Sequence, residues 1–230
     1  MKKIYFKALL PVLIICIIFA IIPSYAQASS KNPVVFVHGY FDSTSDIFGK
    51  SNFSSLKNYL IEQGWPKDNL YVIQFSSITG SNVNNAHELS KFINDILSET
   101  GSKQVDIVAH SMGGLSSRYY VNQLGGVDKV GSLITIGTPH YGTPQAYLAS
   151  WSAGGREMIP RSIFLNYLNN DLLTPGNIHY TSIYTYLDEV VPYRRSRIDG
   201  WNNVGGFYNL HITMLMHNSV HEIVRDNLSQ

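Results

Sequence analysis

Ser111 stands in a sequence context that suits a nucleophile. The stretch Ala109-His110-Ser111-Met112-Gly113 has the spacing of the G-x-S-x-G elbow, with alanine at the first glycine position. An apolar run precedes it and a predicted helix follows it. A tight strand-to-helix turn exposes the serine hydroxyl and needs small residues two positions on either side, because strand and helix cross closely there. A serine can also simply cap a helix, so the inference of a nucleophile depends on this context.

A nucleophilic serine needs donors for the negative charge that develops on the substrate oxygen. The N–H of Met112, at the start of the predicted helix, is one candidate donor. In α/β-hydrolases, the fold that carries this elbow, the loop after an early strand supplies the second donor. That loop follows His38-Gly39 here, where Tyr40 or Phe41 would present the amide. We assign the oxyanion hole to the N–H groups of Tyr40 and Met112, and interpret His38 as a structural residue.

An acid and a base are expected later in the chain, because α/β-hydrolases place the acid after the nucleophile and the histidine last. Asp188 directly follows the predicted strand Thr181–Leu187 and is the preferred acid. Its role would be to orient the imidazole and stabilise its positive charge. Glu189 and Asp199 are the alternatives, and Asp171 is interpreted as a loop residue.

The preferred base is His211, which lies between the last predicted strand and the predicted terminal helix. His217 and His221 are four residues apart on that helix and would share one face. Two such histidines can bind zinc, but no glutamate completes an H-E-x-x-H motif, so we interpret them as an ordinary helix surface. We therefore expect neither a metal site nor a cofactor.

Three further residues are candidates for the substrate pocket: His110, His140 and Phe41. His110 adjoins the nucleophile, and we expect its side chain to point away from the reacting atoms. His140 belongs to Thr138-Pro139-His140-Tyr141-Gly142-Thr143, at the end of a predicted strand. We expect it to line the site and not to act as the base.

Strands and helices alternate along the chain around these residues. Apolar runs predict strands at Pro33–Val37, Leu70–Phe75, Val105–Ala109, Val130–Ile136, Thr181–Leu187 and Asn203–Tyr208. Helical spacing of apolar residues predicts helices at Ser51–Gln63, Asn84–Glu99, Met112–Leu124 and Thr213–Asn227. This alternation implies an α/β fold with about six mostly parallel strands and helices on both faces of the sheet.

The first 28 residues have the pattern of a secretory signal peptide. Lys2, Lys3 and Lys7 precede the apolar stretch Ala8–Ile22, and Ala26-Gln27-Ala28 suits cleavage. The alternative, a membrane anchor, is disfavoured because about 15 apolar residues fall short of the ~20 that span a bilayer. We expect a secreted protein in which residues 29–230 form a single catalytic domain.

The charge of that domain is close to balanced. The whole chain has 17 basic and 16 acidic residues, and loss of the three lysines would leave 14 and 16, a formal charge of −2. This balance argues against nucleic acid as a partner. The single cysteine, Cys16, lies in the leader, so the domain would need no disulfide.

Three stretches together resemble the small secreted lipases of Bacillus: Asn32–Gly39, Val105–Gly114 and Tyr180–Tyr184. Gln63–Trp65 and Arg197–Gly200 fit as well, so the resemblance covers most of the chain after the leader. It implies a minimal α/β-hydrolase that hydrolyses triacylglycerols and short- to medium-chain esters without a catalytic cofactor.

By position, the resemblance places Ser111, Asp188 and His211 on the catalytic triad, and Tyr40 and Met112 on the oxyanion hole. We therefore expect a monomeric lipase whose substrate is an acylglycerol or another ester and which works at a lipid–water interface. An esterase or acyltransferase for soluble short-chain esters is the first alternative. A related binding protein that has lost catalysis is the second.

The chain departs from the minimal lipases between Thr138 and His179, where they are shorter and their site is open. The T-P-H-x-G element here resembles larger bacterial lipases instead. Short helices are expected around Gln145–Trp151 and Ile163–Leu168, and a long irregular segment is usually functional. Residues 139–177 could form a lid or cap. Its apolar side chains would either cover the acyl pocket or pack onto the domain: Trp151, Ile163, Phe164, Leu165, Tyr167 and Leu168.

Overall fold

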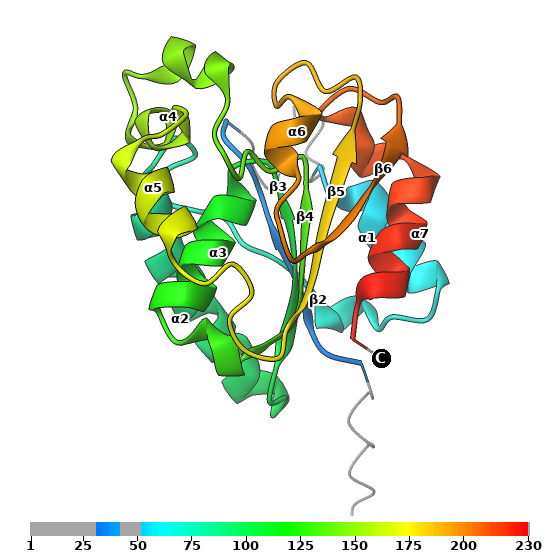
Figure 1. Cartoon of the computed structure of the whole chain (residues 1–230). Helices are drawn as coiled ribbons and strands as arrows, with labels where there is room; N and C mark the ends of the chain where they lie inside the picture. The colour runs from blue at the N-terminus through cyan, green and yellow to red at the C-terminus, as the bar shows by residue number, and fades with distance from the viewer. Residues whose placement is uncertain (1–30, 42–51, 230) are drawn as a thin grey trace, which may run out of the picture.

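Six strands form one parallel sheet in the computed structural model, which describes residues 31–41 and 52–229 (Figure 1). The strands are β1 (Val34–Val37), β2 (Leu70–Val72), β3 (Val105–His110), β4 (Val130–Ile136), β5 (His179–Thr185) and β6 (Asn202–Phe207). Their order is β2-β1-β3-β4-β5-β6, and every neighbouring pair is parallel. The predicted α/β-hydrolase sheet is confirmed. The predicted leader lies outside the described residues.

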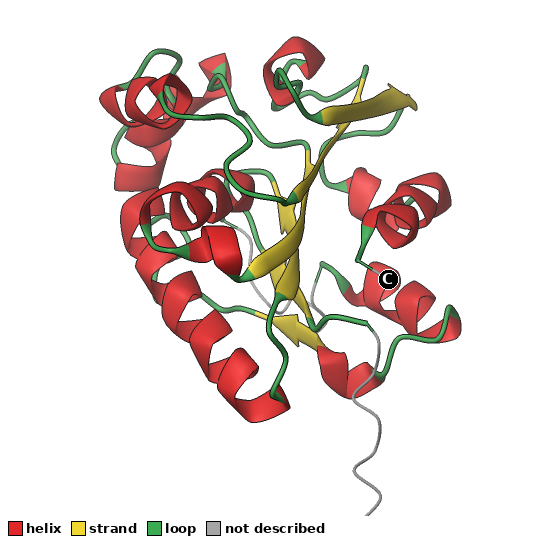
Figure 2. Ribbon diagram, turned by 60° about the horizontal axis from the view of Figure 1, so that its bottom comes forward, coloured by secondary structure: helices red, strands yellow, loops and turns green. Residues whose placement is uncertain are grey.

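Helices cover both faces of this sheet (Figure 2). One face carries α2 (Asn82–Thr100) and α3 (Gly113–Gln123), and the other carries α1 (Ser54–Glu62) and α7 (Asn218–Asn227). Alternate residues of β1 serve the two cores: Val35 and Val37 face one, whereas Val34 and Phe36 face the other. Coverage on both faces explains why the central strands are continuous apolar runs.

The segment between β4 and β5 contains three short helical elements, which lie beside α2 and α3 in Figure 1. They are the 3₁₀ helix η3 (Pro144–Ala149), α4 (Ala153–Met158) and α5 (Ile163–Asn170). The first and last match the expected short helices, whereas α4 was not predicted. A further short helix, α6 (Tyr193–Ser196), follows β5, and 3₁₀ turns occur at Lys67–Asn69 and Gly126–Asp128.

This segment is fixed to the domain by buried polar contacts. The Glu157 carboxylate accepts hydrogen bonds from the Ser81 hydroxyl (2.6 Å) and from the backbone N–H of Asn82 (2.6 Å), so α4 caps the start of α2. Arg118 on α3 donates to the Leu168 carbonyl (3.3 Å) and to Asn169 Oδ1 (3.0 Å) at the end of α5. Both α4 and α5 are thus anchored to the rest of the structure.

The apolar residues of the segment divide into two groups. Phe164, Leu165 and Leu168 are buried in a cluster with Met112 and Leu115. The other three expected lid residues are exposed on the surface: Trp151, Ile163 and Tyr167. The first group therefore packs onto the domain. Only the second group is available at the surface.

The terminal helix begins later than predicted. Thr213–Met216 form the 3₁₀ helix η4, His217 is extended, and α7 starts at Asn218. His221 is buried, with Nε2 2.8 Å from the Leu215 carbonyl oxygen, and burial lowers its pKa. The prediction that His217 and His221 share an exposed helix face is wrong. Within the described ranges, no helix is long and apolar enough to cross a membrane.

Candidate active site

Ser111 occupies a sharp turn between β3 and α3, and its backbone has a positive φ of 51°. This conformation is strained for a residue with a side chain and is held by neighbouring groups. The Ser111 N–H donates to the Ile136 carbonyl (2.9 Å), and the Ser111 carbonyl accepts from the Thr138 hydroxyl (2.8 Å). The end of β4 and the loop that follows it thus engage both backbone polar groups of the serine.

The small residues around the elbow are required by close backbone approach. A Cβ atom at Gly113 would lie 2.5 Å from the His38 carbonyl oxygen and 2.6 Å from that of Val37. A Cβ atom at Gly39 would lie 2.8 Å from the Cβ of Ser111. The loop after β1 and the elbow are therefore in direct contact.

Asp188 and His211 form a buried pair beside the serine. The His211 Nδ1 lies 2.8 Å from Asp188 Oδ2, and the Asp188 side chain is only 1% exposed. The other carboxylate oxygen accepts the N–H groups of Val190 (2.9 Å) and Val191 (2.6 Å). Because the carboxylate can only accept, the neutral tautomer of His211 that fits this contact has its proton on Nδ1 and its lone pair on Nε2.

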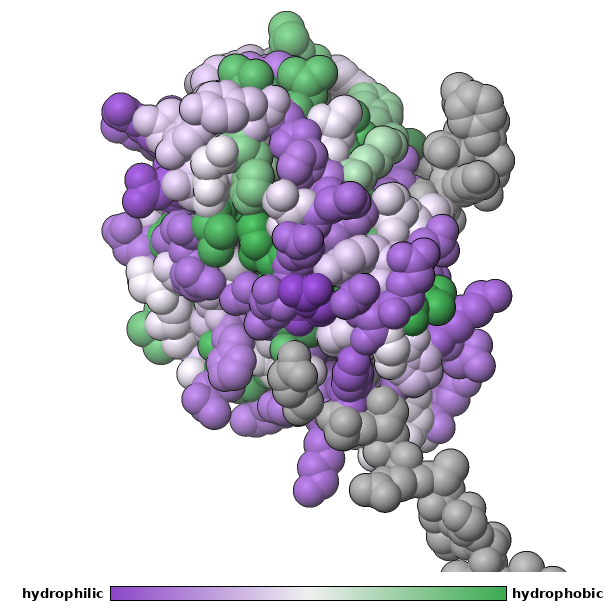
Figure 3. Space-filling view, turned by 90° about the vertical axis from the view of Figure 1, so that its right-hand side faces the viewer, coloured by the Kyte–Doolittle hydropathy of each residue, from purple (hydrophilic) through white to green (hydrophobic). Residues whose placement is uncertain are grey.

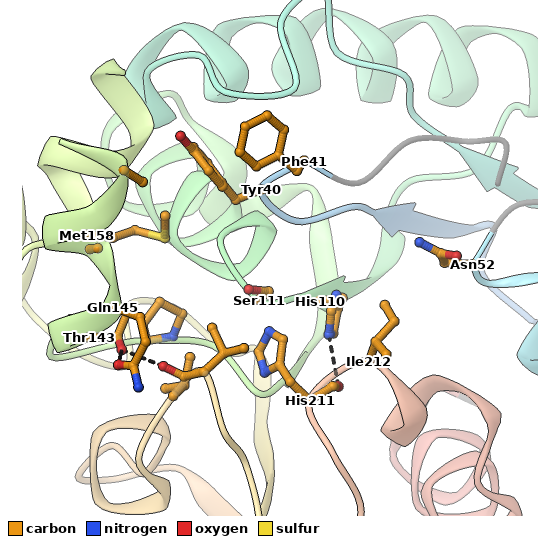
Figure 4. Close-up of a pocket in the computed structure, with 15 residues that line it drawn as sticks. Tyr40, Phe41, Asn52, His110, Ser111, Thr143, Gln145, Met158, His211 and Ile212 are labelled. Carbon is orange, nitrogen blue, oxygen red and sulfur yellow. Dashed lines mark hydrogen bonds between the residues drawn. The ribbon is translucent and has the colours of Figure 1, made fainter. Parts of the chain in front are cut away.

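His211 Nε2 is buried and has no hydrogen-bond partner among the described residues. Its ring faces the cavity that Ser111 also lines (Figure 4). Ser111 follows β3, Asp188 lies three residues beyond β5, and His211 lies four beyond β6. Parallel strands bring these loops to one edge of the sheet, so residues far apart in sequence meet there.

The alternative acids and bases lie elsewhere. The Glu189 carboxylate accepts the backbone N–H of His211 (2.9 Å) and not the ring nitrogen. Asp199 and Asp171 are exposed. The alternative base His221 is packed under η4. Among the carboxylates considered, only that of Asp188 contacts the ring of His211.

The two proposed oxyanion donors flank the serine. Phe41, the alternative to Tyr40, donates its N–H to the Ile78 carbonyl (3.0 Å) and is therefore occupied. Tyr40 lies in the loop after β1, and Met112 precedes the first residue of α3. Neither of their N–H groups is bonded to another described residue, so both remain available to a ligand.

A cavity of about 340 Å³ opens onto Ser111. Figure 4 shows Tyr40 and Phe41 on one side of it and His211 and Ile212 on another. Apart from Asn52 and His110, the remaining lining is mostly apolar. It comes from the stretch between β4 and the end of α4 and from the loop after Asp188: Pro139, Thr143, Gln145, Ala146, Ala149, Met158, Val190 and Val191. An apolar cavity of this size with a few polar groups suits the acyl part of a small ligand.

Of the two histidines predicted to line the pocket, only His110 does so. His110 lines the cavity, and its Nε2 lies 3.3 Å from the His211 carbonyl oxygen, so its side chain does not point away. His140 does not line the cavity. It is buried between Arg118 Nη1 (3.4 Å) and the Thr135 hydroxyl (3.2 Å).

Arg118 and His140 form a buried polar group that the sequence did not indicate. Burial lowers the pKa of Arg118 to about 10. Burial, and then the Arg118 charge, lower the pKa of His140 well below its usual value, so His140 is neutral. A neutral His140 can accept from Arg118 on Nδ1, and this explains how the cation is accommodated without a carboxylate. In residues 31–41 and 52–229, no group of three or more histidine, cysteine or acidic side chains could hold a metal ion.

Part of the chain is similar in sequence to known lipases. The model of the class 2 lipase family matches residues 31–143. A triacylglycerol lipase of Burkholderia plantarii is 29% identical over 132 residues, which are 54% of this chain and 34% of that protein. A triacylglycerol lipase of Vibrio cholerae is 31% identical over 119 residues, which are 52% of this chain and 36% of that protein. The matches thus span about a third of these relatives.

The fold has a solved counterpart over most of its length. The mature form of the Bacillus licheniformis lipase BlEst2 superposes with a TM-score of 0.70, covering 88% of this chain and 94% of that chain, at 18% identity. At this identity the likeness shows the α/β-hydrolase fold. Together with the sequence matches, it supports an ester hydrolase.

Proposed function

We propose that this protein is a secreted, monomeric serine lipase that hydrolyses carboxylic esters of acylglycerols. The observation that carries the proposal is the Asp188–His211 pair, whose free Nε2 faces the same cavity as Ser111, a residue held at φ 51°. Base, nucleophile and apolar cavity are the parts that acyl transfer needs. Secretion rests on the leader-like sequence of residues 1–28.

The reaction would proceed in two halves. In the first, Ser111 Oγ attacks the ester carbonyl carbon while His211 Nε2 takes the hydroxyl proton. The N–H groups of Tyr40 and Met112 would stabilise the oxyanion. Collapse of the tetrahedral intermediate breaks the C–O bond to the alcohol, which leaves with the proton from His211. An acyl-enzyme on Ser111 remains.

In the second half, water attacks the acyl-enzyme as His211 takes one of its protons. The second tetrahedral intermediate collapses, the fatty acid leaves, and Ser111 regains its proton from His211. Asp188 stays ionised throughout and stabilises the imidazolium that forms in each half. The reaction as written needs no metal and no cofactor.

Exposed apolar side chains around the cavity support a lipid–water interface as the place of action. We call this set the apolar rim: Phe41, Tyr147, Leu148, Trp151, Leu187, Tyr208, Leu210, Ile212 and Met216, all at least 38% exposed. Phe41 and Ile212 line the cavity itself, and Leu187 and Leu210 adjoin the triad residues. Figure 3 shows apolar atoms gathered at the end of the molecule where these loops lie. Exposed apolar side chains gathered on one surface favour an interaction site there.

The proposal is tested with Ser111→Ala. Hydrolysis of a chromogenic ester should fall by roughly 10³- to 10⁶-fold while the protein stays folded. The wild type should be labelled by a serine-directed phosphonate, and the variant should not. The exposed Ser77→Ala variant is the control. Unchanged turnover by Ser111→Ala would contradict the assignment, and an unlabelled, inactive wild type would favour a binding protein instead.

A chain-length series separates a lipase from an esterase. Rates are measured on p-nitrophenyl esters of increasing acyl length, and on a short-chain triacylglycerol below and above its solubility limit. A lipase should gain rate when the substrate forms a separate phase, because the apolar rim can then bind it. Activity confined to soluble short-chain esters would support the esterase alternative.

A further inference from the structure

The phenol of Tyr40 is hydrogen bonded to the hydroxyl of Ser152 at 2.6 Å. Tyr40 belongs to the loop after β1, whereas Ser152 belongs to the segment between β4 and β5, 112 residues later. The bond therefore links a proposed oxyanion donor to the part of the chain that sets this protein apart from minimal lipases. Ser152 itself does not line the cavity.

The direction of this hydrogen bond follows from the other contacts of Ser152. Its hydroxyl donates to the Ala149 carbonyl (3.0 Å) and accepts the Gly155 N–H (3.0 Å) as the N-cap of α4. A hydroxyl has one proton and two lone pairs. With its proton used on Ala149, Ser152 can only accept from Tyr40, so the Tyr40 phenol is the donor. The proton and both lone pairs of the Ser152 hydroxyl are then used in hydrogen bonds.

A second link holds the same two elements in register. In the loop before α2, the Ile78 carbonyl accepts a hydrogen bond from the Phe41 N–H (3.0 Å). The adjacent Thr79 carbonyl accepts one from the Gly154 N–H (3.1 Å). Phe41 has a positive φ of 56°, and its ring contacts the ring of Trp151 at 5.8 Å between centroids. The strained backbone after Tyr40 is thus hydrogen bonded to the same loop that the start of α4 contacts.

We propose that Ser152 is a positioning residue for the oxyanion hole: by holding the Tyr40 phenol, it fixes where the Tyr40 N–H points. The inference rests on the proposed function, because it assigns a task to the donor used in that mechanism. It makes the segment between β4 and β5 a structural part of the catalytic site. Oxyanion donors work by being fixed before charge develops, and a shift of about 1 Å in such a group can cost about 100-fold in rate.

The test compares Ser152→Ala with Ser162→Ala. Ser162 has the same N-cap role on α5, accepting the Leu165 N–H (3.1 Å), but its hydroxyl donates to the Glu157 carbonyl and does not touch Tyr40. Both variants lose a cap of a short helix in the same segment. Only Ser152→Ala should lower kcat, by about 10- to 100-fold, which is below the roughly 100- to 1,000-fold seen when a donor is removed outright.

Two further measurements separate positioning from a general loss of stability. KM for a soluble ester should change little, whereas affinity for a trifluoromethyl ketone, which forms an oxyanion on Ser111, should fall in parallel with kcat. Ser152→Thr keeps the hydroxyl and should restore most of the rate. Tyr40→Phe keeps the backbone N–H but removes the phenol donor, so it should match Ser152→Ala, and the double variant should be no slower than either single one.

An unchanged kcat in folded Ser152→Ala, or an equal loss in Ser162→Ala, would overturn the inference. Additive losses in Ser152→Ala and Tyr40→Phe would also overturn it, because the two groups would then act separately. If the wild type neither hydrolyses esters nor reacts with the phosphonate, the proposed function fails and this inference fails with it. An active wild type with an unaffected Ser152→Ala variant rejects the inference alone.

Discussion

The Asp188 carboxylate holds the ring of His211 at 2.8 Å, while the next residue, Glu189, holds the backbone N–H of the same histidine at 2.9 Å. Two adjacent acids thus serve one histidine through different atoms. We expect Asp188→Asn to lower kcat by about 10⁴-fold, because the amide cannot select the tautomer that leaves Nε2 free. Glu189→Gln should lower kcat by less than about tenfold, since its amide oxygen can still accept the backbone N–H.

Steady-state kinetics on a soluble chromogenic ester check this difference. Circular dichroism of both variants serves as the folding control. A larger loss in Glu189→Gln than in Asp188→Asn would reverse the roles of the two carboxylates.

The contact between the elbow and the β1 loop gives a second prediction. Gly113→Ala would place a methyl group 2.5 Å from one backbone carbonyl oxygen and 2.6 Å from another, and backbone atoms cannot yield as a flexible side chain can. We expect a loss of about 1–3 kcal/mol in the free energy of unfolding and at least about 100-fold in kcat, because the serine must shift.

Gly125→Ala is the matched control for this variant. Gly125 has a positive φ of 74° but no atom within 4 Å of an added Cβ. Its replacement should cost about 1–2 kcal/mol of stability for backbone reasons and leave kcat unchanged. Full activity in folded Gly113→Ala would show that the elbow and the loop after β1 can move apart without loss of catalysis.

Burial of Arg118 predicts that α5 depends on it. Arg118→Met leaves Asn169 Oδ1, the Leu168 carbonyl and His140 Nδ1 without their donor. Unsatisfied buried acceptors cost about 1–3 kcal/mol each, which is partly offset because a buried charge is removed. We expect a net loss of about 2–4 kcal/mol in urea unfolding, with faster hydrogen exchange in residues 163–170.

Arg156→Met is the control, since Arg156 is exposed and its side chain, among the described residues, donates only to the carbonyls of Ser150 and Trp151. Its cost should stay within about 0.5–1 kcal/mol. If hydrogen exchange in α5 were the same in both variants, Arg118 would not anchor that helix.

Asp106 gives a prediction of pH dependence. This carboxylate is fully buried, and burial raises its pKa although it accepts from Asn32 Nδ2 (3.2 Å) and from the N–H groups of Ser132 (2.9 Å) and Ser229 (2.8 Å). Between the ordinary carboxyl pKa and this raised pKa, the folded protein keeps a proton that the unfolded chain releases. The contribution of Asp106 to the free energy of unfolding therefore decreases as pH rises through that window.

Asp106→Asn removes this titration. The difference in free energy of unfolding between wild type and variant should decrease as pH rises from about 4, with a slope of at most about 1.4 kcal/mol per pH unit. Urea unfolding at several pH values measures it, with the exposed Asp95→Asn as control. A difference that grows with pH would mean that the hydrogen bonds outweigh burial.

The sheet and the order of the proposed triad could be predicted from sequence because each rests on local information. A strand covered on both faces is a continuous apolar run, and the residues after such runs gather at one edge of a parallel sheet. Asp188 and His211 were found in this way. The start of α7 was placed too early because Thr213–Met216 has helical spacing of apolar residues but forms a 3₁₀ turn.

Other features depend on contacts that no local pattern records. Two adjacent glycines, Gly154 and Gly155, disfavour a helix, yet they lie inside α4. A Cβ at Gly154 would lie 2.6 Å from the Gly80 carbonyl oxygen, and one at Gly155 would collide with Ala149. His140 is predicted in the pocket because it follows β4. In the structure it is buried in contact with Arg118 on α3. Tertiary packing decides both cases.

The proposed triad extends across the sheet from its middle to its edge. Ser111 follows the interior strand β3, whereas His211 follows β6, which is hydrogen bonded to a neighbour on one side only. Edge elements open at lower free energy than the core they flank. Fraying of β6 would separate the base from the nucleophile while β1, β3 and β4 stay paired. Heat inactivation of this protein should therefore be governed by the local stability of its outer strand and should precede the melting of its core.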